Sequence, residues 1–137
     1  MSFRKIFFVL LVSFTFAACA TNDPIVDNQS KTAGDLTIQL TTSTYNGKYS
    51  PEHVLAIWIE SNNGTFVKSL KVGAAERKKY LTNWLGSTSS GNTTDAVTSA
   101  TLRNHVTHNL NWDGTDVKGA VVGDGSYKLC VEFTEND

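Results

Sequence analysis

Short segments of alternating apolar and polar residues recur along the chain. Leu36, Ile38 and Leu40 alternate with threonine and glutamine, a period of two that is typical of a strand with one buried face. The segments 106–112 and 127–133 repeat this pattern. The sequence therefore predicts three half-buried strands.

Two further segments predict strands of other kinds. Residues 54–59 are apolar without interruption, which indicates a strand buried on both faces. Residues 66–72 alternate, so their side chains are expected to point to two opposite faces. The first face would hold Phe66, Lys68, Leu70 and Val72, and the second face would hold Val67, Ser69 and Lys71.

One segment, Ala74 to Leu85, has a helical period instead. Its apolar and long side chains recur every three or four positions, which predicts one amphipathic helix that ends at Gly86. The following residues, 87–94, are rich in serine, threonine, glycine and asparagine, and they predict an exposed loop. The helical stripe consists of Arg77, Tyr80, Leu81, Trp84 and Leu85.

Turns rich in glycine, asparagine and aspartate separate the predicted strands, a pattern that favours an all-β sandwich. Trp112 is expected in its core, and Asp113-Gly114 is expected to form a tight turn. We assign the domain to residues 34–137. Because the sequence stops directly after an apolar strand, we expect either a missing last strand or a chain cut short at its C-terminus.

The N-terminus has the layout of a secretory signal. Arg4 and Lys5 precede a mostly apolar run, residues 6–16, and two alanines follow it. The run has about half of the ~20 residues that a membrane-spanning helix needs. Phe16-Ala-Ala-Cys19 resembles a bacterial lipobox, which implies cleavage before Cys19 and a lipid on that cysteine. An ordinary signal peptide that is cut nearby is the alternative.

This interpretation divides the chain into three parts. Residues 1–18 are a signal peptide, residues 19–33 are a lipid-anchored flexible tether, and the sandwich follows. The tether is expected because the segment is polar and has no hydrophobic period. The protein would then lie in the bacterial periplasm or cell envelope, anchored to a membrane by its lipid.

Charge and cysteine content exclude several kinds of protein. Without the signal peptide the chain has 10 basic and 13 acidic residues, so no nucleic-acid partner is expected. Cys130 would be left without a partner for an intramolecular disulfide, and no cysteine–histidine cluster has the spacing of a zinc site. A hydrolase is not expected, because the sequence has neither a nucleophile elbow nor a phosphate-cradling loop.

Two resemblances extend this picture. Val54 to Leu70, together with His108 to Asp116 and Gly123 to Leu129, resembles the immunoglobulin-like domain at the end of flagellar hook-capping proteins. This resemblance implies an immunoglobulin-like β-sandwich, here with one short helix and a Ser/Thr-rich loop insertion.

The longer stretch from Leu36 to Phe133 is similar to the predicted periplasmic family labelled "domain of unknown function 2271". Its pattern appears as Tyr49-x-Pro51-x-His53-Val54, Ala56-x-Trp58, Gly64-x-Phe66-Val67-Lys68, Trp84-Leu85 and Trp112-Asp-Gly114.

A heptapeptide, Asp95 to Thr101, resembles the recognition motif of the bacterial flavin transferase, Asp-x-x-Ser/Thr-Gly-Ala-Thr. The resemblance implies that FMN is joined through its phosphate to Thr101. Asp95, Thr98 and Ala100 also match the motif, whereas Ser99 stands in place of the usual glycine.

The implied function is that of an extracytoplasmic lipoprotein that carries covalent FMN and transfers electrons. Such a protein is an electron carrier rather than an enzyme. Its partners would be the flavin transferase, membrane or periplasmic redox proteins, and the membrane through the lipid anchor. The alternative function is a non-catalytic immunoglobulin-like assembly or adhesion module of the cell envelope.

For other residues two roles stay open. Trp58 and Trp84 are expected in the core, or else against a flavin ring. The run from Arg77 to Lys79 is either a solvated helix face or a docking patch for an acidic partner or the FMN phosphate. The three histidines are expected to be hydrogen-bonded core or rim residues rather than metal ligands; they are His53, His105 and His108.

We expect Cys19→Ser to release the protein into the soluble extracytoplasmic fraction, because the substitution removes the thiol that accepts the lipid. Fractionation at high salt followed by immunoblotting measures this release. Cys130→Ser is the matched control and should stay with the membrane. A Cys19→Ser protein that also stays there would show that another group is the anchor.

Overall fold

The computed structural model describes residues 29–136. The predicted signal peptide, Cys19 and most of the predicted tether lie outside the described residues. In chain order the elements are β1 (Leu36–Thr41), β2 (Val54–Ser61), β3 (Phe66–Gly73), the 3₁₀ helix η1 (Ala75–Tyr80), α1 (Thr82–Thr88), β4 (Val97–Ser99), β5 (Thr107–Trp112) and β6 (Tyr127–Thr134).

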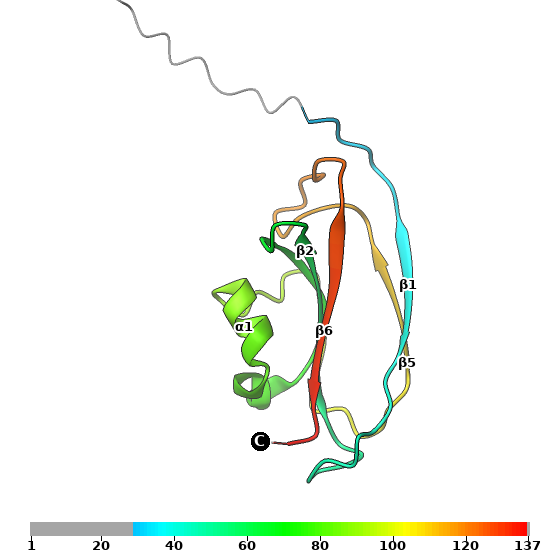
Figure 1. Cartoon of the computed structure of the whole chain (residues 1–137), viewed down its shortest axis with the longest axis vertical. Coiled ribbons are helices and arrows are strands. Elements are labelled where there is room, and N and C mark those ends of the chain that lie inside the picture. Colours follow the sequence, from blue (N-terminus) through cyan, green and yellow to red (C-terminus); the bar gives the residue numbers. More distant parts are fainter. Residues whose placement is uncertain (1–28, 137) are drawn as a thin grey trace, which may run out of the picture.

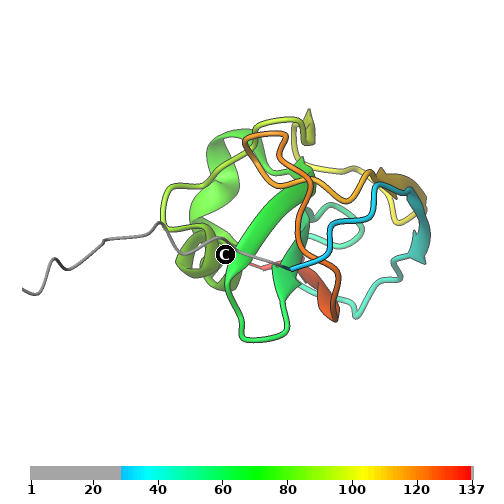
Figure 2. The same ribbon diagram turned by 90° about the horizontal axis from the view of Figure 1, so that it is seen from above.

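These elements form three layers (Figure 1). The middle layer is a four-stranded sheet of order β4-β3-β2-β6, and the second sheet consists of β1 and β5. Seen from above, the helical segment lies on one side of β2 and β3, and the β1–β5 pair lies on the other (Figure 2). The fold is thus mostly β, with two sheets and little helix, which is compatible with the predicted all-β sandwich.

The strand β2 is buried on both faces, as its unbroken apolar sequence predicts. Leu55, Ile57 and Ile59 point toward the second sheet, and the side chains between them point toward the helical layer. The inner core, between the two sheets, contains Ile38, Leu55, Ile57, Ile59, Val67, Leu70, Leu110 and Trp112. The helix-side core contains Val54, Ala56, Trp58, Val72, Ala74, Leu81 and Trp84.

The predicted alternation of β3 is wrong. Phe66 and Leu70 were expected on one face, but Leu70 packs in the inner core and Phe66 packs against the helix-side core. The pairing of β2 with β3 has two register shifts, one after Ile57 and one after Ile59. A bulge adds a residue to one strand and so reverses the faces of the residues beyond it. Simple alternation therefore cannot assign the faces of this strand.

The single helix predicted for residues 74–85 is also wrong. Leu81 has φ −94° and ψ 68°, so the chain leaves η1 there and starts α1 one residue later. The carboxylate of Glu132, on β6, accepts hydrogen bonds from the backbone N–H groups of Asn83 (3.2 Å) and Trp84 (2.9 Å). These bonds satisfy N–H groups in the first turn of α1, which have no partner within the helix.

The end of α1 differs from the prediction as well. The helix runs past Gly86 to Thr88, and Ser89 closes it in the left-handed conformation with φ 57°. The Ser/Thr-rich segment that follows is irregular, as expected. Within residues 29–136, no helix is long and apolar enough to cross a membrane.

The strand β5 has the predicted alternation, with His108, Leu110 and Trp112 buried. Trp112 donates a hydrogen bond from Nε1 to the Thr115 carbonyl oxygen at 2.9 Å, so its polar atom is satisfied inside the core. The strand ends in a turn in which Gly114 has φ 69°, a conformation that glycine adopts without strain.

Trp112→Ala should lower the free energy of unfolding by about 3–5 kcal/mol, because it empties a large site between the two sheets. Urea denaturation followed by circular dichroism measures this loss. Val106→Ala is the control: this side chain is half-exposed just before β5, and its loss should change stability by less than about 0.5 kcal/mol. Equal losses in the two variants would contradict the assignment of Trp112 to the core.

Candidate functional site

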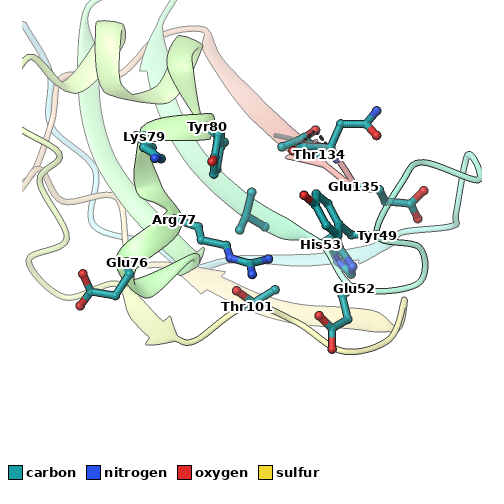
Figure 3. A pocket seen from close by; sticks show the side chains of 12 residues that line it. Tyr49, Glu52, His53, Glu76, Arg77, Lys79, Tyr80, Thr101, Thr134 and Glu135 are labelled. Carbon is teal, nitrogen blue, oxygen red and sulfur yellow. Dashed lines mark hydrogen bonds between the residues drawn. The ribbon is translucent and has the colours of Figure 1, made fainter.

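A pocket of about 240 Å³ opens where η1, the segment before β2 and the C-terminal end of β6 meet (Figure 3). Its walls come from four parts of the sequence that are far apart. They include Tyr49, His53, Arg77, Tyr80, Thr101 and Glu135. The pocket thus combines aromatic rings, two cationic side chains, a hydroxyl and the carboxylates of Glu52, Glu76 and Glu135.

Thr101 is held at this pocket by its neighbour Leu102. The backbone N–H of Leu102 donates to the His53 carbonyl oxygen, and the N–H of His53 donates to the Leu102 carbonyl oxygen, both at 2.9 Å. This bridge fixes the segment beside the start of β2. Thr101 is half-buried and Ala100 is exposed, so the threonine lies on the pocket wall at the edge of an accessible segment.

The other residues of the heptapeptide do not gather around Thr101. Thr98 and Ser99 belong to β4, where they pair in parallel with Val72 and Gly73 of β3. Asp95 lies further away, with its carboxylate 3.9 Å from the Lys68 ammonium group. The heptapeptide therefore runs along the outer edge of the sheet, and only its last residue reaches the pocket.

Ser99, which replaces the usual glycine, lies in an extended strand. Its carbonyl oxygen accepts the backbone N–H of Ala74 at 3.1 Å. The backbone of an extended strand is open to residues other than glycine. Serine is therefore compatible with the folded shape of this segment.

The pocket has cationic side chains next to aromatic rings. The Arg77 guanidinium carbon is 5.7 Å from the centre of the Tyr49 ring, and the Lys48 Nζ is 4.8 Å from the same centre. The Lys79 Nζ lies 5.0 Å from the centre of the Tyr80 ring. Figure 3 shows the Arg77 side chain reaching across the pocket above Thr101. Arg77 and Lys79 thus lie beside ring faces, and three carboxylates share the pocket walls with them.

The tyrosines were not predicted as site residues, whereas the two tryptophans considered for ring packing lie in the helix-side core. Trp84 is fully buried and donates from Nε1 to the Ser69 hydroxyl at 2.9 Å. Trp58 donates to Glu60 at 2.8 Å. For both, the core role is the observed one. Tyr49 belongs to the pattern Tyr49-x-Pro51-x-His53, which resembles that of the periplasmic family. This pattern could have indicated Tyr49 as a site residue.

A cluster of buried polar side chains lies behind the pocket. The rings of His53 and His105 are stacked in parallel, with centres 4.0 Å apart and planes 2° apart. His105 Nε2 pairs with the Glu135 carboxylate at 2.6 Å, and His53 Nδ1 donates to the Pro51 carbonyl oxygen at 3.1 Å. These two histidines are hydrogen-bonded side chains of the core and its rim, as expected.

Glu135 fastens this cluster to the loop before β2. Its side chain is buried, and it accepts the backbone N–H of Gly47 at 2.6 Å as well as the His105 bond. Burial raises the pKa of Glu135, but hydrogen bonds from Thr44, Gly47 and His105 outweigh it and lower the pKa to about 2. The carboxylate is therefore charged at any ordinary pH.

The third histidine, His108, is hydrogen-bonded to a lysine. Lys71 Nζ donates to His108 Nδ1 at 3.0 Å, and burial together with this cation lowers the pKa of His108. Burial also lowers the pKa of His53, and the nearby His105 lowers it further. Among residues 29–136, no group of three or more histidine, cysteine or acidic side chains is placed to hold a metal ion.

The fold and the pocket define a β-rich, two-sheet domain with a polar site at one end. The chain belongs to the family of predicted periplasmic proteins known as DUF2271, whose family model matches residues 31–137. No curated protein and no solved structure matches the chain. The periplasmic location expected from the N-terminus agrees with this family.

Glu135→Gln should reduce stability at pH 7, because the folded state holds this carboxyl at a pKa of about 2 against an ordinary 4.5. The stability that wild type has over the variant should be fully present above pH 4.5 and disappear as the pH falls toward 2. Urea unfolding across this pH range measures it. Glu52→Gln, at an exposed carboxyl on the same pocket, is the control. A wild-type advantage that stays constant with pH would contradict the prediction.

Proposed function

We propose that this protein carries FMN, joined through its phosphate to the Thr101 hydroxyl, and serves as an electron-transfer module in the periplasm. One observation carries the proposal: Thr101, the acceptor implied by the heptapeptide, borders a pocket that also holds aromatic rings and a guanidinium group. The protein is an electron carrier in this proposal, not an enzyme.

The chemistry of the pocket walls supports this ligand. A phosphodiester on Thr101 keeps a negative charge, and Arg77 and Lys79 are the cations that line the same pocket. The faces of Tyr49 and Tyr80 suit offset stacking with a planar ring. FMN would supply one- and two-electron chemistry, and the protein would supply attachment and environment.

Accessibility of the heptapeptide supports modification by a flavin transferase. Val97, Thr98 and Ser99 are exposed and form a three-residue strand at the edge of the sheet. An edge strand offers unpaired backbone groups to another protein. The transferase would therefore reach the segment without entering either core.

The place of the carrier in the cell follows from its N-terminus. A lipid on Cys19 would keep the domain near a membrane, within reach of membrane or periplasmic redox proteins. We also propose that the two sheets form an immunoglobulin-like sandwich. The inner core between facing sheets, with Trp112 as its aromatic residue, supports this finer classification.

A second candidate function is a non-catalytic assembly or adhesion module of the cell envelope. It is favoured by β6, the outermost strand of its sheet in the described part of the chain. This strand exposes Leu129 and Val131, at 42% and 39%. Strand addition by another protein would cover such an edge.

The colour of the purified protein separates the two proposed functions. A purified carrier is yellow, whereas an assembly module is colourless.

Co-expression with a flavin transferase should give a wild-type tryptic peptide ending at Arg103 that is heavier by one FMN less one water. Thr101→Ala should lose this mass and the yellow colour, because no acceptor hydroxyl remains at the pocket. Peptide mass spectrometry and visible absorption measure the two effects.

The matched controls are Thr98→Ala and Ser99→Gly, which should both keep modification. A wild-type protein that stays unmodified under conditions that label a known carrier would contradict the proposal. The assembly module would then be the better account.

A further inference from the structure

The strand β6 leaves one of its edges unpaired within residues 29–136. Its other edge pairs with β2 in one continuous register (Figure 1). The strand at the opposite end of the sheet, β4, has only three residues. Folded proteins usually protect a long edge strand with a bulge, a proline or charged side chains. β6 has neither a bulge nor a proline, and its only charged residues are Lys128 and Glu132.

Two apolar side chains of β6 are exposed on the side that faces the second sheet. Leu129 pairs with Ile59 and Val131 pairs with Ile57, so both lie on the same face as the inner core. They are nevertheless 42% and 39% exposed, because the two-stranded β1–β5 sheet is narrower than the four-stranded sheet that it covers. Exposed apolar residues at an unpaired sheet edge indicate a surface that a further strand would cover.

The order of residues in β6 is complementary to a second copy of the same strand. With Cys130 on the two-fold axis of an antiparallel pair, Lys128 of each copy lies opposite Glu132 of the other. Leu129 then lies opposite Val131, and Cys130 lies opposite itself. Each pair joins residues of one face, as side chains in paired strands require.

The charges select this axis over its neighbours. An axis at Leu129 would place Lys128 opposite Cys130, and an axis at Val131 would place Glu132 opposite Cys130. Both alternatives lose the two pairs of opposite charge. Opposite charges that face each other across strands stabilise a pair, so they favour the register centred on Cys130.

We propose that β6 is the interface of a symmetric dimer, in which two copies of this chain pair antiparallel through this strand with Cys130 at the centre. The two four-stranded sheets then continue into one another. The free edge of each β6 gains backbone hydrogen bonds, and Leu129 and Val131 of the two copies pack together. Such a self-complementary contact is the usual one in two-fold dimers. The inference does not depend on the attachment of FMN.

The first experiment tests the register in intact cells that export the full chain. Leu129→Cys and Val131→Cys, each combined with Cys130→Ser, are produced together with different tags and treated with diamide. Two thiols form one S–S bond, and their two hydrogens and two electrons reduce diamide to the hydrazine. Non-reducing gels should show mainly the mixed dimer, because directly opposite residues are close enough for a disulfide and diagonal ones are not.

The second experiment tests the charge pairs without a covalent link. Sedimentation equilibrium of the exported protein, reduced and in a density-matched detergent, should show a monomer–dimer equilibrium. Lys128→Glu places like charges opposite each other twice in the dimer, so the dissociation constant should rise about tenfold. Lys118→Glu is the matched control, because it makes the same charge change in an exposed turn outside β6, and it should dimerise like wild type.

Mixed disulfide dimers together with a selective effect of Lys128→Glu support the inference. A protein that stays monomeric overturns it, and so does a dimer that the two lysine variants weaken equally, since its contact lies elsewhere. Cysteine variants that link with themselves as readily as with each other overturn the register. Neither measurement involves FMN, so failure of this inference is distinct from failure of the proposed function.

Discussion

The burial of β2 is the constraint on which the rest of this structure depends. The strand is hydrogen-bonded to β3 on one edge and to β6 on the other, and apolar side chains cover both of its faces. One face needs the β1–β5 sheet, and the other face needs the helical layer. That layer includes η1 and packs beside the start of β2. The pocket forms there because Arg77 and Tyr80 of η1 come next to His53.

The parts of the fold that follow from local patterns could be predicted from the sequence. The alternation of β5 and the unbroken apolar run of β2 identify their buried faces correctly, because each strand obeys its own period. The faces of β3 could not be predicted, since they depend on bulges in the pairing with β2. The break between the two helices at Leu81 could not be predicted either. The carboxylate of Glu132 that caps α1 comes from a strand about fifty residues later.

The candidate site also divides into residues that the local sequence identifies and residues that only the fold brings together. Thr101 was found through the resemblance of a heptapeptide, which is a local feature of the sequence. The walls of the pocket come from distant segments, so Tyr49, Arg77 and Glu135 could not be joined without the fold. His53 was weighed only as a core or rim residue. Its backbone also positions the segment that contains Thr101, a role that only the fold reveals.

The parallel pairing of β4 with β3 bears on when a modification could take place after export. β4 contributes only three residues, lies outside both cores and is followed closely by Thr101, the proposed acceptor. Elements with few buried contacts open locally at a small fraction of the cost of global unfolding. A modifying enzyme could therefore bind β4 in a locally opened form of the folded domain, and the strand could pair with β3 again afterwards. Attachment would not have to compete with folding, and a mature protein could be loaded long after it reaches its compartment.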